Sequence, residues 1–186
     1  MDERTVLAGS EDKMKKVVEG FKKMLASTRA GRATPTLLEK VVVDYYGVPT
    51  PISQVANIGV QPPRTLVIQA WDKKMIGPIE KAIQKGDLGA MPVSDGNLVR
   101  LTIPALTGER RQELVKTIRK QAEAEKVSIR NIRRDYIEEI KKAEKDHEIS
   151  EDESRRIQEK VQKLTDKYVK NVDELTAIKE KEVTEV

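Results

Sequence analysis

Proline is confined to the middle of this sequence, and that restriction limits the possible folds more than any other feature. All eight prolines lie between Pro35 and Pro104, and residues 105–186 contain none. Proline fixes its own backbone angle and lacks the amide hydrogen that a helix interior needs. The sequence therefore predicts helical outer segments on either side of an inserted segment of strands and turns.

Charged residues are distributed just as unevenly. Residues 33–106 hold seven of the 35 basic and six of the 31 acidic residues, so most charges lie in the outer segments. This density is typical of long solvated helices rather than of a domain with a thick core. The formal net charge is only +4, so any affinity for nucleic acid must come from local clusters of bases.

Apolar residues recur at steps of three and four in the outer segments, which predicts three helices. The first should begin near Ser10, acting as N-cap, and end before Pro35. The second should run from a Thr107 cap to a break at 146–149, roughly 57 Å. The third begins with a capping box at 150–153. Its apolar seam is Ile157, Val161, Leu164, Tyr168, Val172, Leu175 and Ile178.

The inserted segment predicts a small mixed α/β domain. Strands are expected near 41–46, 55–60, 65–71 and 98–103, and a helix at 75–85. Gly47, Pro49 and Pro51 favour turns and broken edge strands over a continued ladder. The aromatic residues Tyr45, Tyr46 and Trp71 are expected in this domain's core; the alternative, exposed rings that stack on bases, lacks interleaved basic residues.

Together these elements predict an α+β fold in two domains. Residues 1–30 and 107–186 would form an elongated antiparallel three-helix bundle, in which the first helix closes the groove between two long helices. Residues 31–106 would form the inserted domain. The paired linkers near 31–35 and 103–107 would act as a hinge, unless they are ordinary loops between rigidly packed domains.

The basic residues fall into three groups. On the long second helix, Arg119, Lys126, Arg130, Arg133 and Lys141 project from one side, with Arg134 beside them. Arg29 and Arg32 end the first helix, and Arg110 and Arg111 begin the second. Arginine suits bidentate contact with phosphate, so these groups predict an RNA-binding surface that stays exposed when the bundle packs. Two alternatives to RNA binding remain. The face of the second helix could be a solvated surface of salt bridges, since Glu123 lies on it, and the arginines at the helix ends could cap backbone carbonyls.

Little in the sequence points to catalysis. The chain has no cysteine, and its only histidine, His147, lies in a polar turn. No metal-ligand spacing, phosphate-binding glycine loop or nucleophile motif occurs. We therefore expect a protein that is not an enzyme and has no cofactor or metal. No apolar run approaches the ~20 residues of a membrane span, and no signal peptide is evident, so a cytosolic protein is expected.

Seven motifs resemble the ribosome recycling factor family: RAGRATP at 29–35, DYYGVPTP at 44–51, DLG at 87–89, TGERR at 107–111, IRNIRRD at 129–135, ISEDE at 149–153 and QKLTD at 162–166. The resemblance implies an L-shaped molecule whose bundle binds large-subunit ribosomal RNA in the post-termination ribosome. The smaller domain would meet elongation factor G, whose GTP hydrolysis would drive separation of the subunits and release of mRNA and tRNA. We expect the factor to act as a monomer.

The same resemblance assigns roles to individual residues. The family's RNA-contacting arginines fall on Arg29, Arg32, Arg110, Arg130 and Arg133. Its hinge falls on Gly31, Arg32, Ala33, Thr34 and Pro35 and on Ile103, Pro104, Ala105 and Leu106. Ala105 departs from the family, in which many members carry a second proline. Two other classes remain open: a general RNA-binding helical protein and a helical adaptor for other proteins.

Overall fold

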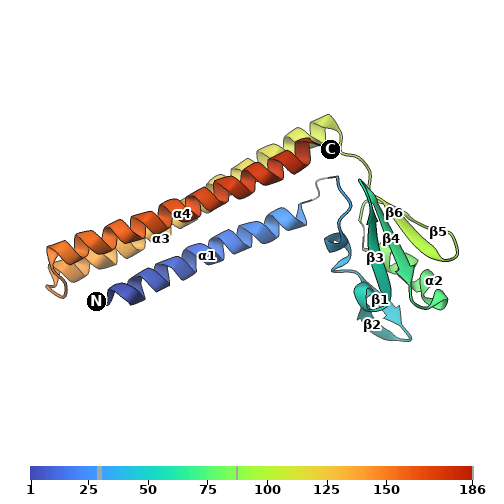
Figure 1. Ribbon diagram of the computed structural model, residues 1–186, viewed down its shortest axis with the longest axis horizontal. Helices are drawn as coiled ribbons and strands as arrows, with labels where there is room; N and C mark the ends of the chain where they lie inside the picture. Colours follow the sequence, from blue (N-terminus) through green and yellow to red (C-terminus); the bar gives the residue numbers. More distant parts are fainter. Residues whose placement is uncertain (29–30, 87, 186) are drawn as a thin grey trace. The chain divides into compact units, whose positions relative to one another are not determined.

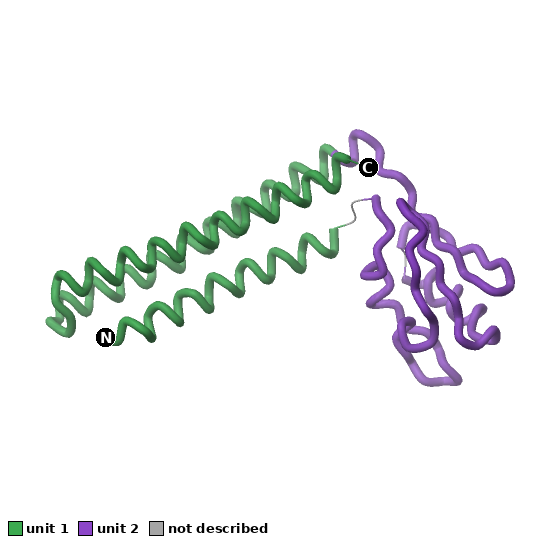
Figure 2. The backbone as a smooth tube through the Cα atoms, in the orientation of Figure 1, with its two compact units in different colours: residues 1–28, 112–185 green, residues 29–111, 186 purple. Residues whose placement is uncertain are grey.

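The protein divides into two compact units of different architecture (Figures 1 and 2). The structure, a computed structural model, describes residues 1–28, 31–86 and 88–185. One unit comprises residues 1–28 and 112–185, and the other spans residues 29–111. The fold is α+β, as predicted.

The first unit is a bundle of three helices: α1 at Glu3–Ser27, α3 at Gly108–Lys145, whose first turn belongs to the second unit, and α4 at Glu151–Thr184. The prediction that Ser10 caps α1 is wrong. The N-cap is Asp2, whose carboxylate accepts a hydrogen bond from the Thr5 amide at 3.1 Å. Ser10 lies in the helix interior, fully buried, and donates its hydroxyl hydrogen to the Leu7 carbonyl. A small hydroxyl that bonds its own helix can occupy a core position.

The limits of α3 and the start of α4 agree with the sequence prediction. The Thr107 hydroxyl accepts the Arg110 amide at 3.1 Å at the start of α3. A turn at residues 146–149 reverses the chain, and there His147 adopts a positive φ of 58°. Ser150 and Glu153 form the predicted capping box, in which each side chain accepts the other's backbone amide. The two helices therefore begin and end where their caps require.

Buried apolar residues of all three helices meet along the bundle axis, for example in the cluster of Val6, Tyr136, Ile140, Ile157 and Val161. On α4 the buried positions are Ser154, Ile157, Val161, Thr165, Tyr168, Val172 and Val183. The predicted seam is therefore wrong toward its end, because Ile178 is 59% exposed. The buried stripe follows the 3.6-residue period of a straight helix instead of a strict heptad.

The second unit contains two antiparallel sheets. Strands β1 (Val42–Tyr45) and β2 (Val48–Pro51) form a hairpin through Tyr46 and Gly47, whose positive φ values of 49° and 84° suit a two-residue turn. The predicted turn is present at Gly47, but Pro49 and Pro51 pair with β1 in a continuous ladder, so the preference for broken strands there is wrong. A two-stranded hairpin tolerates proline because each strand has an edge that needs no partner.

The larger sheet has the strand order β3-β4-β6-β5, with β3 at Ala56–Gln61, β4 at Thr65–Ala70, β5 at Pro92–Ser94 and β6 at Leu98–Thr102. Every neighbouring pair is antiparallel. Helix α2 (Ile76–Lys85) packs its apolar side on the central strands. Their shared core includes Leu66, Ile68, Ile79, Ile83, Val99 and Leu101.

The three aromatic residues expected in this core lie at the surface. Tyr45, Tyr46 and Trp71 are 41%, 69% and 63% exposed. Aliphatic residues from the two central strands and α2 fill the interior, so the rings have no room inside. Among the described residues, no helix is long and apolar enough to cross a membrane.

Candidate nucleic-acid interface

The predicted basic surface of α3 lies within the bundle unit and is only partly exposed. Arg130, Arg134 and Lys141 are exposed. The prediction of full exposure is wrong for Lys126, whose side chain is 14% exposed, and Arg133 is also half-buried. Periodicity places side chains around one helix but does not show how closely a neighbouring helix approaches them.

Three of these basic residues contact α4. Arg119 makes two hydrogen bonds with Glu180, from Nε to Oε1 at 2.6 Å and from Nη2 to Oε2 at 3.2 Å. Seven residues along α3, Lys126 binds Asp173 at 2.9 Å and also Glu123 at 2.7 Å.

Seven residues further, Arg133 Nη1 donates to Gln162 Oε1 at 3.0 Å. The hydrogen bonds to Glu123 and Asp173 raise the pKa of Lys126, and those to Glu180 raise the pKa of Arg119. The alternative interpretation, that basic residues on this face form internal salt bridges, therefore holds for Arg119 and Lys126.

Arg130 differs from these three. It is exposed, and it forms no ion pair with any residue that the structure describes. Arg134 donates to the neutral Asn131 side chain, and it forms no described salt bridge. An unpaired guanidinium keeps its donors available for phosphate oxygens. Arg130 and Arg134 are thus the arginines of α3 best placed to bind an anion.

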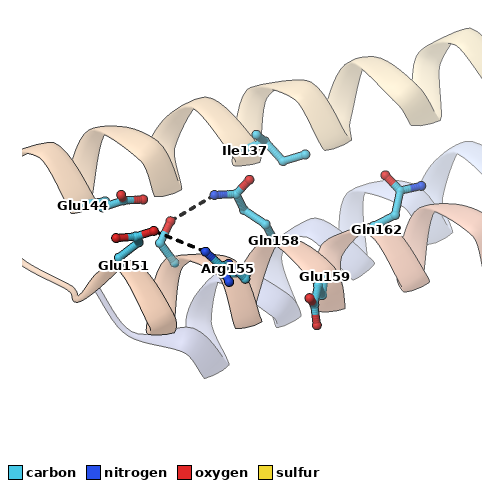
Figure 3. A pocket seen from close by; sticks show the side chains of 8 residues that line it. Ile137, Glu144, Glu151, Arg155, Gln158, Glu159 and Gln162 are labelled. Atoms are coloured by element: carbon cyan, nitrogen blue, oxygen red, sulfur yellow. Dashed lines mark hydrogen bonds and ion pairs between the residues drawn. The ribbon is translucent and has the colours of Figure 1, made fainter.

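A shallow groove lies between α3 and α4 (Figure 3), and Gln162, the partner of Arg133, is part of its lining. Its volume is 440 Å³, and its lining is Ile137, Glu144, Glu151, Ser154, Arg155, Gln158, Glu159 and Gln162. Gln158 donates to Ser154 at 3.0 Å, and Arg155 is paired with Glu151 at 3.2 Å. Its three glutamates, Glu144, Glu151 and Glu159, make this groove unfavourable for phosphate.

Helix α4 also forms ion pairs with α1. Here α4 supplies the basic residues and α1 the carboxylates, which is the reverse of the arrangement between α4 and α3. Glu3 of α1 binds both Arg156 and Lys160 of α4. Glu11 of α1 accepts hydrogen bonds from Tyr168 Oη at 2.8 Å and from Lys167 Nζ at 3.3 Å. Sequence reasoning missed these pairs, although the four-residue spacing of Arg156 and Lys160 places two bases on one side of the helix.

The other predicted arginines belong to the second unit. Arg29 lies outside the described residues, and Arg32 is exposed. Arg110 is exposed and Arg111 is half-buried, both in the first turn of α3. The Nε atom of Arg111 is buried without a hydrogen-bond partner among the described residues. Positive charge at a helix N-terminus opposes the helix dipole, which favours binding of an anion nearby.

Two of the predicted hinge residues are fixed within the second unit. Ala33 and Ile103 are buried in its core. The Ala33 amide donates to the Pro63 carbonyl at 3.1 Å, and the Ile103 amide donates to the Arg64 carbonyl at 2.7 Å.

Gly31 is also buried and closely packed, because a β-carbon there would lie 3.1 Å from Leu106 Cγ, and its positive φ of 75° suits glycine.

The fold and surface define a class of protein: a charged helical bundle with an inserted α/β unit and an arginine-bearing helix face. The sequence model of the family described as ribosome recycling factor matches residues 21–183. The chain belongs to the ribosome recycling factor family, whose members are translation factors associated with ribosomes.

Curated relatives match over nearly their whole length. The ribosome-recycling factor of Heliobacterium modesticaldum is 56% identical over 177 residues, covering 95% of this chain and 96% of the relative. That of Bacillus subtilis is 53% identical over 183 residues, covering 98% and 99%. The similarity therefore includes both units.

Solved structures agree. A solution structure of ribosome recycling factor superposes with a TM-score of 0.81 at 41% identity, covering 100% of this chain and 99% of that chain. A second match, at a TM-score of 0.66 and 41% identity, covers 98% and 99%. It is the T. thermophilus ribosome recycling factor, with E. coli elongation factor G, bound to the E. coli post-termination complex.

Proposed function

We propose that this protein recycles ribosomes at the end of translation. It would bind the post-termination ribosome and, together with elongation factor G, separate the subunits and release mRNA and tRNA. Family membership over most of the chain supports this proposal, as does the structural relative bound with elongation factor G to a post-termination complex.

The bundle would contact large-subunit ribosomal RNA through the arginine-bearing face of α3. Arg130 carries this part of the proposal because it is exposed and has no ion-pair partner among the described residues. The contacts would go mainly to phosphates, since structured RNA is recognised largely by shape and backbone. The full set of candidate contacts is Arg29, Arg32, Arg110, Arg111, Arg119, Lys126, Arg130, Arg133 and Arg134.

These candidates differ in the free energy that they would lose by breaking existing ion pairs in order to bind RNA. Arg119 and Lys126 would have to release Glu180 and Asp173 before they could bind phosphate. An exposed ion pair contributes only about 0–1 kcal/mol, so this exchange is feasible for Arg119, whereas Lys126, whose side chain is 14% exposed, would also have to move out of a largely buried position. Arg130 and Arg134 need no such exchange with a carboxylate. We therefore assign the first contact with RNA to them.

The protein would act without making or breaking a covalent bond, and the energy would come from GTP hydrolysis by elongation factor G. Residues 1–30 and 107–186 would act as one domain and residues 31–106 as the other. Motion between them would occur at 31–32 and 104–107, because Ala33 and Ile103 are held in the core of the second unit. A monomer acting in the cytoplasm would suffice for this role.

The decisive experiment is disassembly of purified post-termination complexes with elongation factor G and GTP, followed by light scattering. We expect subunit separation that requires this protein, the GTPase and GTP together. Arg130→Ala should slow it, whereas Lys120→Ala, an equal charge loss at another exposed position of α3, should not. A wild-type protein that leaves the complexes intact would refute the proposed function.

A further inference from the structure

The second unit has a surface pocket that the proposed function does not use. It has a volume of 480 Å³ and is lined by Tyr45, Thr50, Gln54, Val55, Trp71, Asp72 and Met75. The lining comes from both strands of the β1–β2 hairpin, from the short helix after it and from the segment after β4. The whole pocket is therefore built within one unit.

Its walls and floor differ in character. Val55 and Met75 are 5% and 3% exposed and give the pocket an apolar floor. Tyr45 and Trp71 line it while keeping large exposed surfaces, at 41% and 63%. Exposed aromatic rings that flank a concave apolar site are typical of places where a partner's side chain is bound.

Asp72 is the one carboxylate in this lining. Its Oδ1 accepts the Lys74 amide at 3.0 Å, and its Oδ2 accepts the Tyr46 hydroxyl at 3.2 Å. A carboxylate has about four acceptor positions, so two remain. Asp72 forms no ion pair with the residues that the structure describes, and none of their lysines or arginines lies over Tyr45 or Trp71.

We propose that this pocket binds an arginine or lysine side chain presented by a partner protein. The cation would lie against the electron-rich faces of Tyr45 and Trp71, while its N–H groups would donate to the free positions of Asp72. The aliphatic stem would cover Val55 and Met75. A nucleobase could stack on the same rings. However, the pocket lining contains no lysine or arginine to bind the phosphate of a nucleotide, and the Asp72 carboxylate would repel that phosphate. The inference is independent of the proposed function.

Trp71 is the only tryptophan in the chain, so its indole N–H gives a single nuclear magnetic resonance signal that reports on this pocket. The probe is N-acetyl-Leu-Arg-Ala-amide, added to the ¹⁵N-labelled full-length protein. We expect a saturable shift of that signal. The same peptide with neutral citrulline in place of arginine should bind at least about fivefold more weakly, because the cation supplies most of the attraction.

Two variants test the role of the carboxylate. Asp72→Asn, which keeps an oxygen able to accept the Lys74 amide, should markedly reduce the preference for arginine over citrulline, because only the cation–π contribution of Tyr45 and Trp71 remains. Glu39→Gln removes one negative charge from an exposed position outside the pocket and should leave the preference unchanged. Equal binding of the two peptides, no saturable shift, or a stronger response to adenosine monophosphate than to the arginine peptide would each overturn the proposal.

Discussion

Gly9 of α1 lies directly against the hydroxyl group of Tyr136 of α3. A β-carbon built on Gly9 would lie 2.7 Å from Tyr136 Oη and 3.6 Å from Cζ. Glycine normally weakens a helix interior, so its presence here has a packing reason. The missing side chain makes room for the buried tyrosine, and this brings the two helices together near the α1 N-terminus.

We expect Gly9→Ala to lower the free energy of unfolding by about 1 kcal/mol, because crowding against Tyr136 exceeds the gain in helix propensity. In a Tyr136→Phe background the nearest atom is removed, and the same substitution should stabilise the bundle by about 0.5–1 kcal/mol. Urea unfolding followed by helical circular dichroism measures both changes. Gly20→Ala is the control, since no atom lies within 4 Å of a β-carbon there, and it should stabilise in either background.

A Gly9→Ala variant as stable as Gly20→Ala in the wild-type background would show that Tyr136 moves aside without cost. The coupling between positions 9 and 136 would then be absent from the double-mutant cycle.

Arg130→Ala should weaken binding to the large ribosomal subunit. We expect about a tenfold loss at moderate salt, and a decrease of about 0.7–0.9 in the slope of log affinity against log salt concentration, as for one lost phosphate contact. Sedimentation with subunits at several salt concentrations measures both. If Lys120→Ala lowers affinity and slope by the same amounts, the effect is one of net charge and the assignment of Arg130 fails.

Glu180→Gln tests whether the internal ion pair restrains Arg119. Loss of the exposed pair should lower the free energy of unfolding by at most about 1 kcal/mol. Freed from its carboxylate, Arg119 should raise affinity for the large subunit about two- to threefold at low salt, an effect that higher salt removes. Glu174→Gln makes the same change in net charge at a residue paired within α4, and should have a smaller effect. Equal affinities for the two variants would exclude Arg119 as an RNA contact.

Tyr168 gives the bundle a predictable response to alkaline pH. Burial, together with the hydrogen bond to Glu11, raises the pKa of Tyr168 from 10.0 to about 12. The folded state therefore holds this proton more tightly than the unfolded state. The stabilising contribution of the protonated Tyr168 hydroxyl is fully present below about pH 10 and is lost as the pH rises through about 12.

Absorbance of tyrosinate during an alkaline titration should show one group that ionises near pH 12, absent from Tyr168→Phe. The same variant should have a smaller loss of stability between pH 10 and 12. At acid pH the same hydrogen bond acts through Glu11, and stability then changes with pH in the opposite direction. The hydrogen bond from Tyr168 lowers the pKa of Glu11 below 4.5, so that contribution is present above pH 4.5 and is lost as the pH falls. An unchanged alkaline titration in Tyr168→Phe would contradict the assignment.

The sequence was most informative where local chemistry decides the structure. The capping box at Ser150 and Glu153 and the limits of α3 depend on residues a few positions apart, and both predictions were confirmed. The start of α1 was missed because Ser10 is a good N-cap by type, whereas Asp2 actually performs that role. Choosing between them requires knowing that α4 packs beside the first turns of α1.

Contacts between distant segments could not be predicted from one sequence. Periodicity placed Lys126 and Arg119 on the correct side of α3, but it could not show that α4 presents Asp173 and Glu180 to them. The exposure of Trp71 was missed for a related reason. Aromatic residues favour cores on average, and only the packing of α2 on the sheet shows that this core is already full.

The opposite charges on the two sides of α4 have a consequence for how the bundle assembles. Three helices of these lengths can pack in two arrangements of opposite hand, which differ by exchanging the places of α1 and α3 beside α4. Both would bury similar apolar surfaces. In the exchanged arrangement, however, Arg156 and Lys160 would lose their ion pairs with Glu3, and Asp173 and Glu180 would lose theirs with Lys126 and Arg119. Loss of these ion pairs would disfavour the mirror topology, so charged residues on the surface would help to select one of two bundles with similar apolar cores.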